Sequence, residues 1–306
     1  MADSLRLEVP EELAGERLDR SLAMLLEVSR AQARQLIEAG VMLDGRGAKP
    51  SDRVTAGAMI ESPEPALVVE LKPEPVAFEV IHADEELIVV DKPPGLVVHP
   101  GAGRTEGTLV AGLLDRYPDL LGVGTPGRWG LVHRLDRDTS GVLLVGRTAE
   151  AYEKLTSDLA GRRIGRVYNA LVKGRFATQT GTIEAPIGRD PARPTRRAVI
   201  AGGKPATTHY EVVTEFPGAD VTLVEVRLDT GRTHQIRVHM AAIGHPVIAD
   251  RLYASFNQPV KSPRIFLHAR RVELKHPGSG KPVAYEAPLP GDLREVLDEL
   301  TAAGSG

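Results

Sequence analysis

The densest group of reactive side chains lies in the segment HRLDRDTS, residues 133–140. These eight residues hold one imidazole, two arginines, two carboxylates and two hydroxyls, and the apolar run VLLV follows after one glycine. A polar loop that leads into a buried strand is a place where a rigid scaffold presents catalytic groups. The alternative is a turn in which Asp138 and Ser140 hydrogen-bond to backbone amides, and the residue types alone leave it open.

A carboxylate such as Asp136 can act as a nucleophile without activation by a metal or a cofactor. Burial beside apolar side chains would raise its pKa from about 3.9, and a cation within hydrogen-bond reach would oppose that rise. Arginine suits this role because its guanidinium stays charged and can hold both carboxylate oxygens. The chemistry of the loop therefore favours an arginine partner.

The residue types do not favour a metal or nucleotide cofactor. His234 and His239 are five residues apart, which places them off one helical face, and no H-x-H or H-E-x-x-H spacing occurs. The chain has no cysteine, which excludes disulfides and thiolate metal sites. His133 with two loop carboxylates stays open as a less favoured ligand set. Pro126 interrupts a G-x-G-x-x-G match at residues 122–127, so that segment does not predict a dinucleotide site.

The loop resembles a signature of the RluA/RluD-type pseudouridine synthases, H-R-L-D-x-x-T-S-G, which the segment from His133 to Gly141 matches at every specified position. The resemblance implies that Asp136 is the catalytic aspartate. It also implies that Arg134 enters the RNA and helps to displace the target nucleotide. Such an enzyme breaks the N1–C1′ bond of uridine, turns the base and rejoins it through C5. The residues leave open whether Asp136 adds to the base, attacks the ribose carbon or abstracts a ribose proton.

Two further segments resemble the same family, in the same order along the chain. GRVYNALVKG, residues 165–174, is similar to its K-x-Y-x-A-x-V-x-G strand, which implies that Tyr168 stacks on the target base. LDTGRTHQIRVHMAAIGHPVIAD, residues 228–250, is similar to a later motif. That motif implies Arg237 as the partner of Asp136, in preference to Arg232, and Ile236 as an apolar wall of the base pocket. The family's glycine before the final aspartate is an alanine here.

Three further side chains are candidate contacts with the substrate or the loop: His133, Arg232 and His234. His133 is expected to hydrogen-bond to backbone and shape the loop. His234 is expected to do the same or to touch RNA. None of them is expected to bind a metal.

A smaller module precedes these motifs. GERLDRSLAMLL and SRAQARQLIEAG predict two helices, with Ser29 as an N-cap and Gly40 as a stop, and short strands around an Asp44-Gly45 turn. The pattern resembles the S4 RNA-binding domain, whose turn is usually Asn-Gly. Two arginines one helical turn apart, Arg30 and Arg34, predict a basic face, and the resemblance implies that this face contacts RNA.

The chain divides into four predicted parts: a leader at 1–14, the S4-like domain at 15–72, the catalytic domain at 73–300 and a disordered tail at 301–306. A proline-rich stretch before residue 76 supports the central boundary. The resemblance implies an α+β fold. Its catalytic domain would have a large, mixed, mostly antiparallel sheet with flanking helices, after a small N-terminal α/β module.

Charge and hydropathy give the expected partners. The net charge of −3 shows no overall basic excess, but residues 162–175 and 189–204 are locally basic and flank the candidate loop, which favours phosphate contact. No apolar run approaches the roughly 20 residues that span a bilayer, and the N-terminus lacks a secretory layout. We therefore expect a cytoplasmic monomer that needs no cofactor. The resemblances imply that it binds RNA, with large-subunit ribosomal RNA as the favoured substrate. The alternatives are a transfer RNA synthase, a non-catalytic RNA-binding or ribosome-assembly protein, and a metal-dependent hydrolase of nucleotides.

Overall fold

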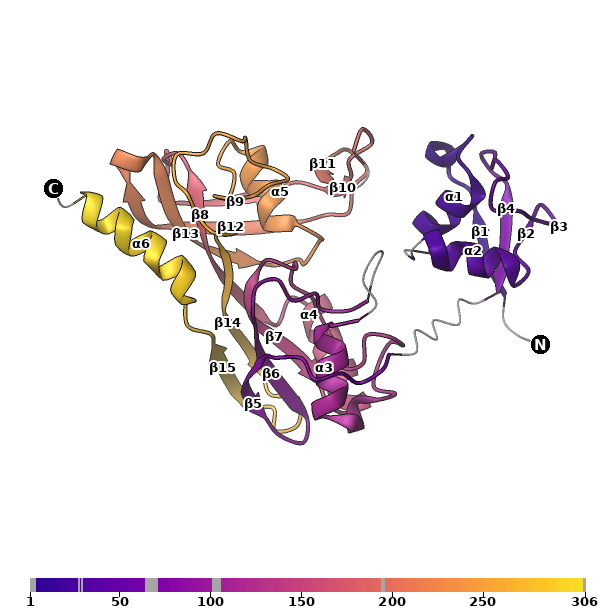
Figure 1. The fold of residues 1–306 in the computed structure, drawn as a ribbon, viewed down its shortest axis with the longest axis horizontal. Helices are drawn as coiled ribbons and strands as arrows, with labels where there is room; N and C mark the ends of the chain where they lie inside the picture. The colour runs from indigo at the N-terminus through magenta and orange to yellow at the C-terminus, as the bar shows by residue number, and fades with distance from the viewer. Residues whose placement is uncertain are drawn as a thin grey trace.

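The structure of the chain is a computed structural model. It describes residues 4–26, 28, 30–63, 71–100, 106–193 and 196–304, without the side chains of residues 31 and 32. The N-cap predicted at Ser29 therefore lies outside the described residues. Figure 1 shows two sets of elements, a small one from the N-terminal part of the chain and a large one built around a long sheet.

The N-terminal module consists of two helices and a four-stranded sheet. The helices are α1 (Leu18–Leu25) and α2 (Arg30–Glu38). The strands are β1 (Ser4–Glu8), β2 (Met42–Leu43), β3 (Arg46–Gly47) and β4 (Met59–Pro63), in the order β1-β4-β2-β3. The predicted turn between β2 and β3 is confirmed, since Asp44 and Gly45 have φ angles of 49° and 75°. Two successive positive φ angles are typical of tight hairpin turns.

The predicted leader is wrong as a separate segment. β1 pairs antiparallel with β4 along five residues, and Val9 and Leu13 are 1% and 6% exposed in the core of this module. The alternation of apolar and charged residues in LRLEV is the period-2 pattern of a half-buried strand. The module therefore extends from residue 4 to residue 63 within the described part of the chain.

The larger part of the chain, predicted as the catalytic domain, contains a nine-stranded sheet with the order β5-β6-β7-β14-β8-β13-β12-β9, and β15 pairs with β14. All of its pairs are antiparallel except that of β7 with β14. The predicted large, mixed, mostly antiparallel sheet is confirmed. The strands are β5 (Glu79–Ala83), β6 (Leu87–Lys92), β7 (Ser140–Gly146), β8 (Gly165–Lys173), β9 (Thr180–Glu184), β12 (Thr207–Phe216), β13 (Val221–Leu228), β14 (Leu267–Lys275) and β15 (Pro282–Glu286). A separate hairpin is formed by β10 (Ile187–Arg189) and β11 (Arg197–Val199).

Both faces of the sheet are covered, so the central strands are continuous apolar runs. In β6, Ile88 and Val90 pack into one core cluster, while Leu87 and Val89 pack into another. Residues of α3 (Leu109–Arg116) and α5 (Gln235–Ala242) belong to the first cluster. Leu155 of α4 (Ala149–Ala160) belongs to the second. Successive side chains of a strand point to opposite faces, which explains the division.

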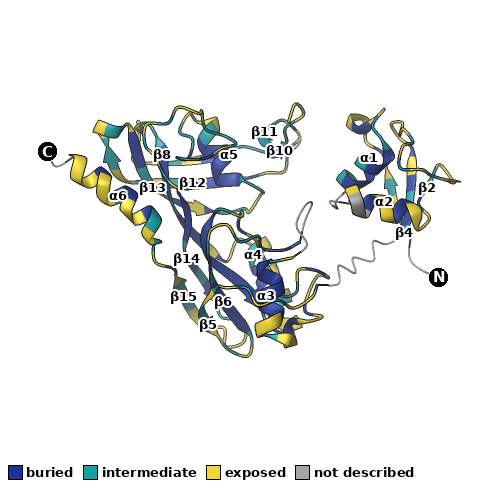
Figure 2. Cartoon of the chain, viewed as in Figure 1, coloured by how far each residue is buried: buried dark blue, intermediate teal, exposed yellow. Residues whose placement is uncertain are grey.

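The C-terminal helix α6 (Gly291–Gly304) packs Leu293, Val296 and Leu300 against a further cluster of the sheet. The predicted disordered tail at 301–306 is therefore wrong for residues 301–304, which continue this helix. Residues 305–306 lie outside the described part. Figure 2 shows the exposed residues of α6 on its outer side and the buried ones concentrated in the sheet.

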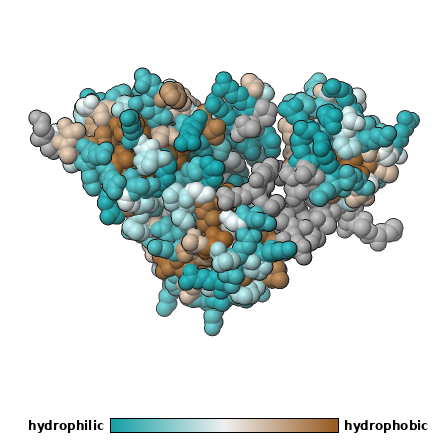
Figure 3. All heavy atoms as spheres, in the orientation of Figure 1, coloured by the Kyte–Doolittle hydropathy of each residue, from teal (hydrophilic) through white to brown (hydrophobic). Residues whose placement is uncertain are grey.

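The boundary predicted at 72–73 lies next to residues 64–70, which are not described, and it stays a prediction. Leu71 packs against the main core of the catalytic part. Among the described residues, no helix has both the length and the apolar character to cross a membrane. The face drawn in Figure 3 is mostly hydrophilic, with smaller apolar patches between polar ones.

The parallel contact of β7 with β14 depends on a glycine. His268 and Ala269 pair with Ser140 and Gly141 at the start of β7. Gly141 has a φ angle of 113°, and an added Cβ would collide with the backbone oxygen of Ala269. This glycine therefore allows the loop that carries Asp136 to enter the sheet.

Replacing Gly141 with alanine is expected to lower the free energy of unfolding by about 2 kcal/mol or more, through backbone strain and overpacking. Urea unfolding of the full chain measures this change. Gly218→Ala is a matched control, because no atom lies within 4 Å of the added Cβ and its φ angle is not positive. Equal midpoints for the two variants would contradict the assignment.

Candidate active site

The loop before β7 and the first turn of α5 meet in an ion pair. Arg237 NH1 donates to Asp136 Oδ2 at 2.8 Å, although the two residues are 101 positions apart. The side chain of Arg237 is 10% exposed and that of Asp136 is 21% exposed. Arg232, the less favoured partner, is exposed and donates through Nε to the carbonyl of Pro205 instead. The geometry therefore agrees with the choice of Arg237.

Asp250 holds the other side of Arg237, and the sequence analysis assigned it no role. Its two carboxylate oxygens accept from Arg237 Nε and NH2 at 2.8 and 2.9 Å, and its side chain is fully buried. Burial disfavours the charged guanidinium, but the two carboxylates outweigh this effect and raise the pKa of Arg237 above its ordinary value. Asp250 lies in the motif that resembles the family. Its role in neutralising the buried Arg237 could not be predicted, because that role depends on which side chains the fold brings together.

Ala249 precedes this aspartate where the family has glycine. Its φ angle is 59°, so the left-handed backbone that glycine would favour is retained by an alanine. The turn therefore keeps its geometry at a modest cost in backbone strain.

A cavity of about 330 Å³ opens above the ion pair. Tyr168 on β8 and Ile236 on α5 line it and are 6% and 4% exposed. Burial raises the pKa of the Tyr168 hydroxyl, so this ring stays neutral. The volume lies in the range of small-molecule pockets, roughly 300–1,000 Å³. An aromatic face, an aliphatic wall and the Asp136 carboxylate therefore line one cavity.

The structure brings His133 and His234 to the same cavity in different roles. His133 Nε2 accepts from the backbone amide of Leu144 on β7 at 3.0 Å, a contact with backbone of the kind expected of this side chain. His234 does not make the expected backbone contact. Its Nδ1 lies 2.9 Å from the Tyr253 hydroxyl, and its Nε2 lies 3.9 Å from Asp136 Oδ1. Burial lowers the pKa of both imidazoles.

The polar residues around Asp136 do not form the simple turn that was the alternative. The Asp138 carboxylate pairs with the side chain of Arg137 at 3.0 Å, and Ser140 Oγ lies 3.0 Å from His268 Nδ1. Arg264 donates to the Asp138 carbonyl and to Ser140 Oγ, at 3.2 and 3.1 Å. The side chain of Arg264 also pairs with Asp292 on α6. The C-terminal helix thus helps to fix the loop.

Lys92 at the end of β6 hydrogen-bonds to the loop that carries Asp136. It is fully buried, and its Nζ donates to the carbonyls of Pro93, Leu96 and Arg137 at 2.8 to 3.0 Å. Burial lowers its pKa to about 7, and the charges of Asp136 and Asp138 oppose this shift. A lysine at the end of an apolar run gave no clear signal in the sequence, because its acceptors are carbonyls of two separate loops.

The two basic segments predicted from the sequence lie in different parts of the fold. In the first, Arg162, Arg163 and Arg175 each pair with a carboxylate, and Arg166 is buried. This segment is therefore largely neutralised by the protein itself. The second segment forms the β10–β11 hairpin, which projects from the sheet beside α5 (Figure 1).

Arg30 and Arg34 of the N-terminal module share one buried carboxylate. Asp19 Oδ2 accepts from Arg30 NH2 at 2.8 Å and from Arg34 Nε at 3.1 Å, and Arg17 Nε lies 3.2 Å from Asp19 Oδ1. Burial alone would raise the pKa of Asp19, but these hydrogen bonds outweigh it and hold it far below the usual range. Both helical arginine side chains remain 52% exposed, so each keeps donors on the surface.

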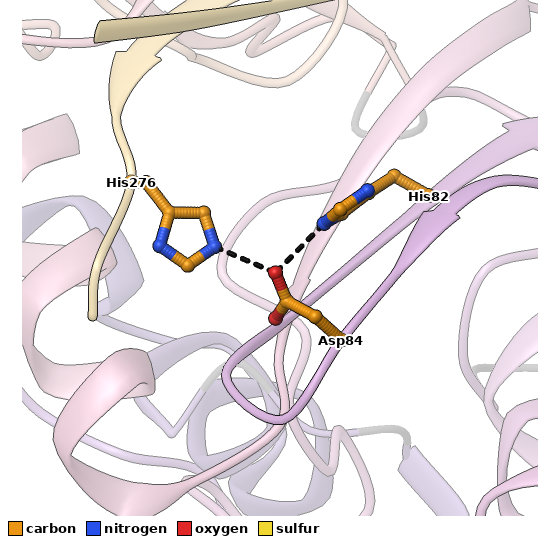
Figure 4. A group of neighbouring side chains, drawn as sticks. All are labelled: His82, Asp84 and His276. Carbon is orange, nitrogen blue, oxygen red and sulfur yellow. Dashed lines mark hydrogen bonds and ion pairs between the residues drawn. The ribbon is translucent and has the colours of Figure 1, made fainter. Parts of the chain in front are cut away.

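One group in the described part of the chain has the composition of a metal site: His82, Asp84 and His276 (Figure 4). Both histidines place Nε2 2.8 Å from Asp84 Oδ2. His276 Nδ1 accepts from the amides of Gly278 and Ser279, so its proton belongs on Nε2, where a metal would need a lone pair. These hydrogen bonds therefore indicate a structural group that connects the β5–β6 turn to the end of β14. The proposed loop ligands, His133 with two carboxylates, do not form such a group among the described residues.

Comparisons with known proteins agree with this site. A family model described as RNA pseudouridylate synthase matches residues 86–242, and an S4 domain model matches residues 16–60. An uncharacterized RNA pseudouridine synthase of Chloroflexus aurantiacus is 46% identical over 95% of this chain and 92% of its own length. Ribosomal large subunit pseudouridine synthase D of Pseudomonas aeruginosa is 42% identical over 96% of this chain and 94% of its own. A solved structure, human RNA pseudouridylate synthase domain containing 1, has a TM-score of 0.58 and 26% identity, covering 76% of this chain and 96% of that one.

Asp250 and Asp136 are expected to differ in their contributions to stability. Asp250→Asn leaves a buried guanidinium donor unmatched and should lower the free energy of unfolding by about 3–5 kcal/mol. Asp136→Asn removes one bond from a partly exposed carboxylate and should cost about 1 kcal/mol. Urea unfolding of both variants beside the wild type measures the difference. Equal losses would show that Asp250 is not the main support of Arg237.

The half-buried His133 predicts an acid-dependent loss of stability. Burial, with a smaller effect of Arg166, lowers its pKa from 6.5 to about 3. Between these values the unfolded chain binds a proton that the folded chain does not, so stability falls as the pH drops below 6.5. His133→Gln keeps an acceptor for Leu144 but does not titrate. Its stability should fall by about 1.4 kcal/mol less per pH unit than that of the wild type, measured by urea unfolding between roughly pH 6 and 5. Parallel losses in the two proteins would rule out the assigned shift.

Proposed function

The chain belongs to the RNA pseudouridylate synthase family, and from this we propose that it converts uridine to pseudouridine in large-subunit ribosomal RNA with Asp136 as the nucleophile. The observation that carries the proposal is the Asp136–Arg237 pair at the base of a cavity walled by Tyr168 and Ile236. Arg237 donates a hydrogen bond to the Asp136 carboxylate, and a carboxylate can act as a nucleophile without a metal or a cofactor.

The cavity fits a reaction in which the base must not escape. The N1–C1′ bond breaks, the free uracil turns, and C5 bonds to C1′ before the C5 proton is lost. Tyr168 offers a face for stacking, which contributes roughly 1–3 kcal/mol per base, and Ile236 closes the space on α5. The target must first leave its stack, at a cost of a few kcal/mol. Arg134 at the mouth of the cavity has the length and charge to occupy the vacated place.

The ribosomal substrate is supported by two features. Relatives that align over nearly the whole chain are named ribosomal large subunit pseudouridine synthase D, in Pseudomonas aeruginosa and in Nitrosomonas europaea. The S4 domain adds a second RNA-binding unit, in which Arg30 and Arg34 are held by Asp19 with donors left on the surface. We propose that these arginines bind RNA phosphates, and that the protein acts as a cytoplasmic monomer. Arg232 and His234, which line the cavity, are proposed substrate contacts.

Tritium release from ribosomal RNA transcribed with uridine labelled at C5 tests this function. Wild type should release tritium in the presence of EDTA, and Asp136→Asn should release it at least about 10³-fold more slowly, because the nucleophile is lost. Asp138→Asn is the matched control, since this carboxylate pairs with Arg137 on the same loop and does not line the cavity. It should keep most of the wild-type rate.

The other outcomes separate the rival functions. Loss of release in EDTA that added zinc restores would favour a metal-dependent enzyme. Release from transfer RNA but not from ribosomal RNA would change the assigned substrate and leave the assigned reaction unchanged. Binding of ribosomal RNA without release from any RNA would favour a non-catalytic RNA-binding protein. An active Asp136→Asn variant would overturn the assignment of the nucleophile.

A further inference from the structure

His99 lies at the wall of the same cavity, on a segment that the reaction described above does not use. The segment is fixed by the start of α3, because the carbonyls of Val97 and Val98 accept from the amides of Leu109 and Val110 at 2.8 and 3.0 Å. His99 itself is only 7% exposed. An imidazole held in this way cannot move far from the cavity.

Among the described residues, one other side chain hydrogen-bonds to this ring. His99 Nε2 lies 3.4 Å from Arg134 NH1, and His99 Nδ1 is buried without a hydrogen-bond partner among the described residues. A guanidinium has no acceptor, so Nε2 must accept and the proton of the neutral ring must sit on Nδ1. Burial, and then the charges of Arg134 and Arg128, lower the pKa of His99 to about 4, which keeps the ring neutral near pH 7.

Other buried histidines of this chain show what a purely structural role looks like. His239 uses one ring nitrogen with Thr208 and the other with the carbonyl of Ala185. His268 likewise uses both nitrogens, with Ser140 and with the carbonyl of Ala287. Among the described residues, His99 pairs through Nε2 with Arg134 at the cavity mouth, and no other residue is a partner of its Nδ1. Its bonding therefore differs from that of a satisfied core histidine.

We propose that His99 is a positioning residue, which holds the Arg134 guanidinium at the mouth of the cavity before RNA arrives. This inference rests on the proposed function, in which Arg134 takes the place of the displaced nucleotide. A freely moving arginine side chain would lose rotational freedom about several bonds when it binds RNA. Orientation before binding reduces that entropic cost.

A neutral acceptor suits this task better than a carboxylate. A carboxylate would form a strong, charge-assisted pair with Arg134 and cancel the charge that attracts RNA. An imidazole orients the guanidinium through one weak bond and leaves its charge and its other donors available. The 3.4 Å contact can be given up when the arginine meets phosphate or base.

A double-mutant cycle on single-turnover tritium release tests the proposal. His99→Phe should slow release about tenfold at saturating protein, with little change in RNA affinity, while His99→Gln should keep most of the rate because its amide oxygen can accept. In an Arg134→Ala background, His99→Phe should cause no further loss. The same fractional loss in both backgrounds, or no loss in the wild-type background, would overturn the proposal.

Two controls guard against damage to the fold. Thermal unfolding of each variant shows whether it is folded at the assay temperature. His209→Phe removes a histidine from β12 whose side chain is 40% exposed and which does not line this cavity, and it should leave the rate unchanged.

An RNA-free measurement separates this inference from the proposed function. An NMR titration of the His99 ring in the full chain should show a pKa that rises in Arg134→Gln, because a neighbouring positive charge is removed. Arg128, the other nearby charge, is unchanged in that variant. An unaltered pKa would overturn the contact. If wild type released no tritium, the proposed function would fail, and this titration alone would decide whether His99 holds Arg134.

Discussion

The site depends on one guanidinium shared by two carboxylates. Arg237 makes two hydrogen bonds to the buried Asp250 and one to the partly exposed Asp136. A buried arginine without partners would be costly, and Asp250 removes that cost by accepting two hydrogen bonds from the guanidinium. Because Asp250 uses Nε and NH2, NH1 is left pointing at Asp136, so one carboxylate orients and the other stays available for chemistry.

This arrangement explains several features of the fold that lie away from the cavity. Asp136 lies in the loop before β7, Arg237 in α5 and Asp250 in the turn before Leu252. The sheet must therefore hold three segments that are distant in the sequence close together in space. Gly141 lets the loop approach β14 closely, and Arg264 ties the same loop to α6. Lys92 binds the Arg137 carbonyl from the opposite side. The loop carrying Asp136 is therefore held by side chains from β6, from the residues before β14 and from the C-terminal helix.

The sequence predicted the centre of the site well because the chemistry is concentrated in short motifs. Asp136, Tyr168 and Arg237 stand in three ordered segments, and the structure gathers them at one cavity. The supporting residues escaped prediction for a physical reason. Lys92, Asp250 and Arg264 act through backbone carbonyls or through another side chain, and such partners depend on tertiary packing. The leader was mistaken because a five-residue edge strand carries only a short alternating pattern.

The arginines and the histidines around the cavity differ in charge near neutral pH. Arginines carry the positive charge, and they repel protons from the imidazoles among them. The pKa of His133 lies at about 3 and that of His99 at about 4, chiefly through burial and further through neighbouring arginines. His234 is lowered for the same first reason, with Asp136 opposing. Near neutral pH these rings are therefore neutral donors and acceptors, which can shape a loop or orient a guanidinium without adding charge. The arginines therefore keep their charge around neutral pH while these imidazoles stay uncharged. Lys92, which binds the loop carrying Asp136 and whose pKa burial lowers to about 7, titrates in this range.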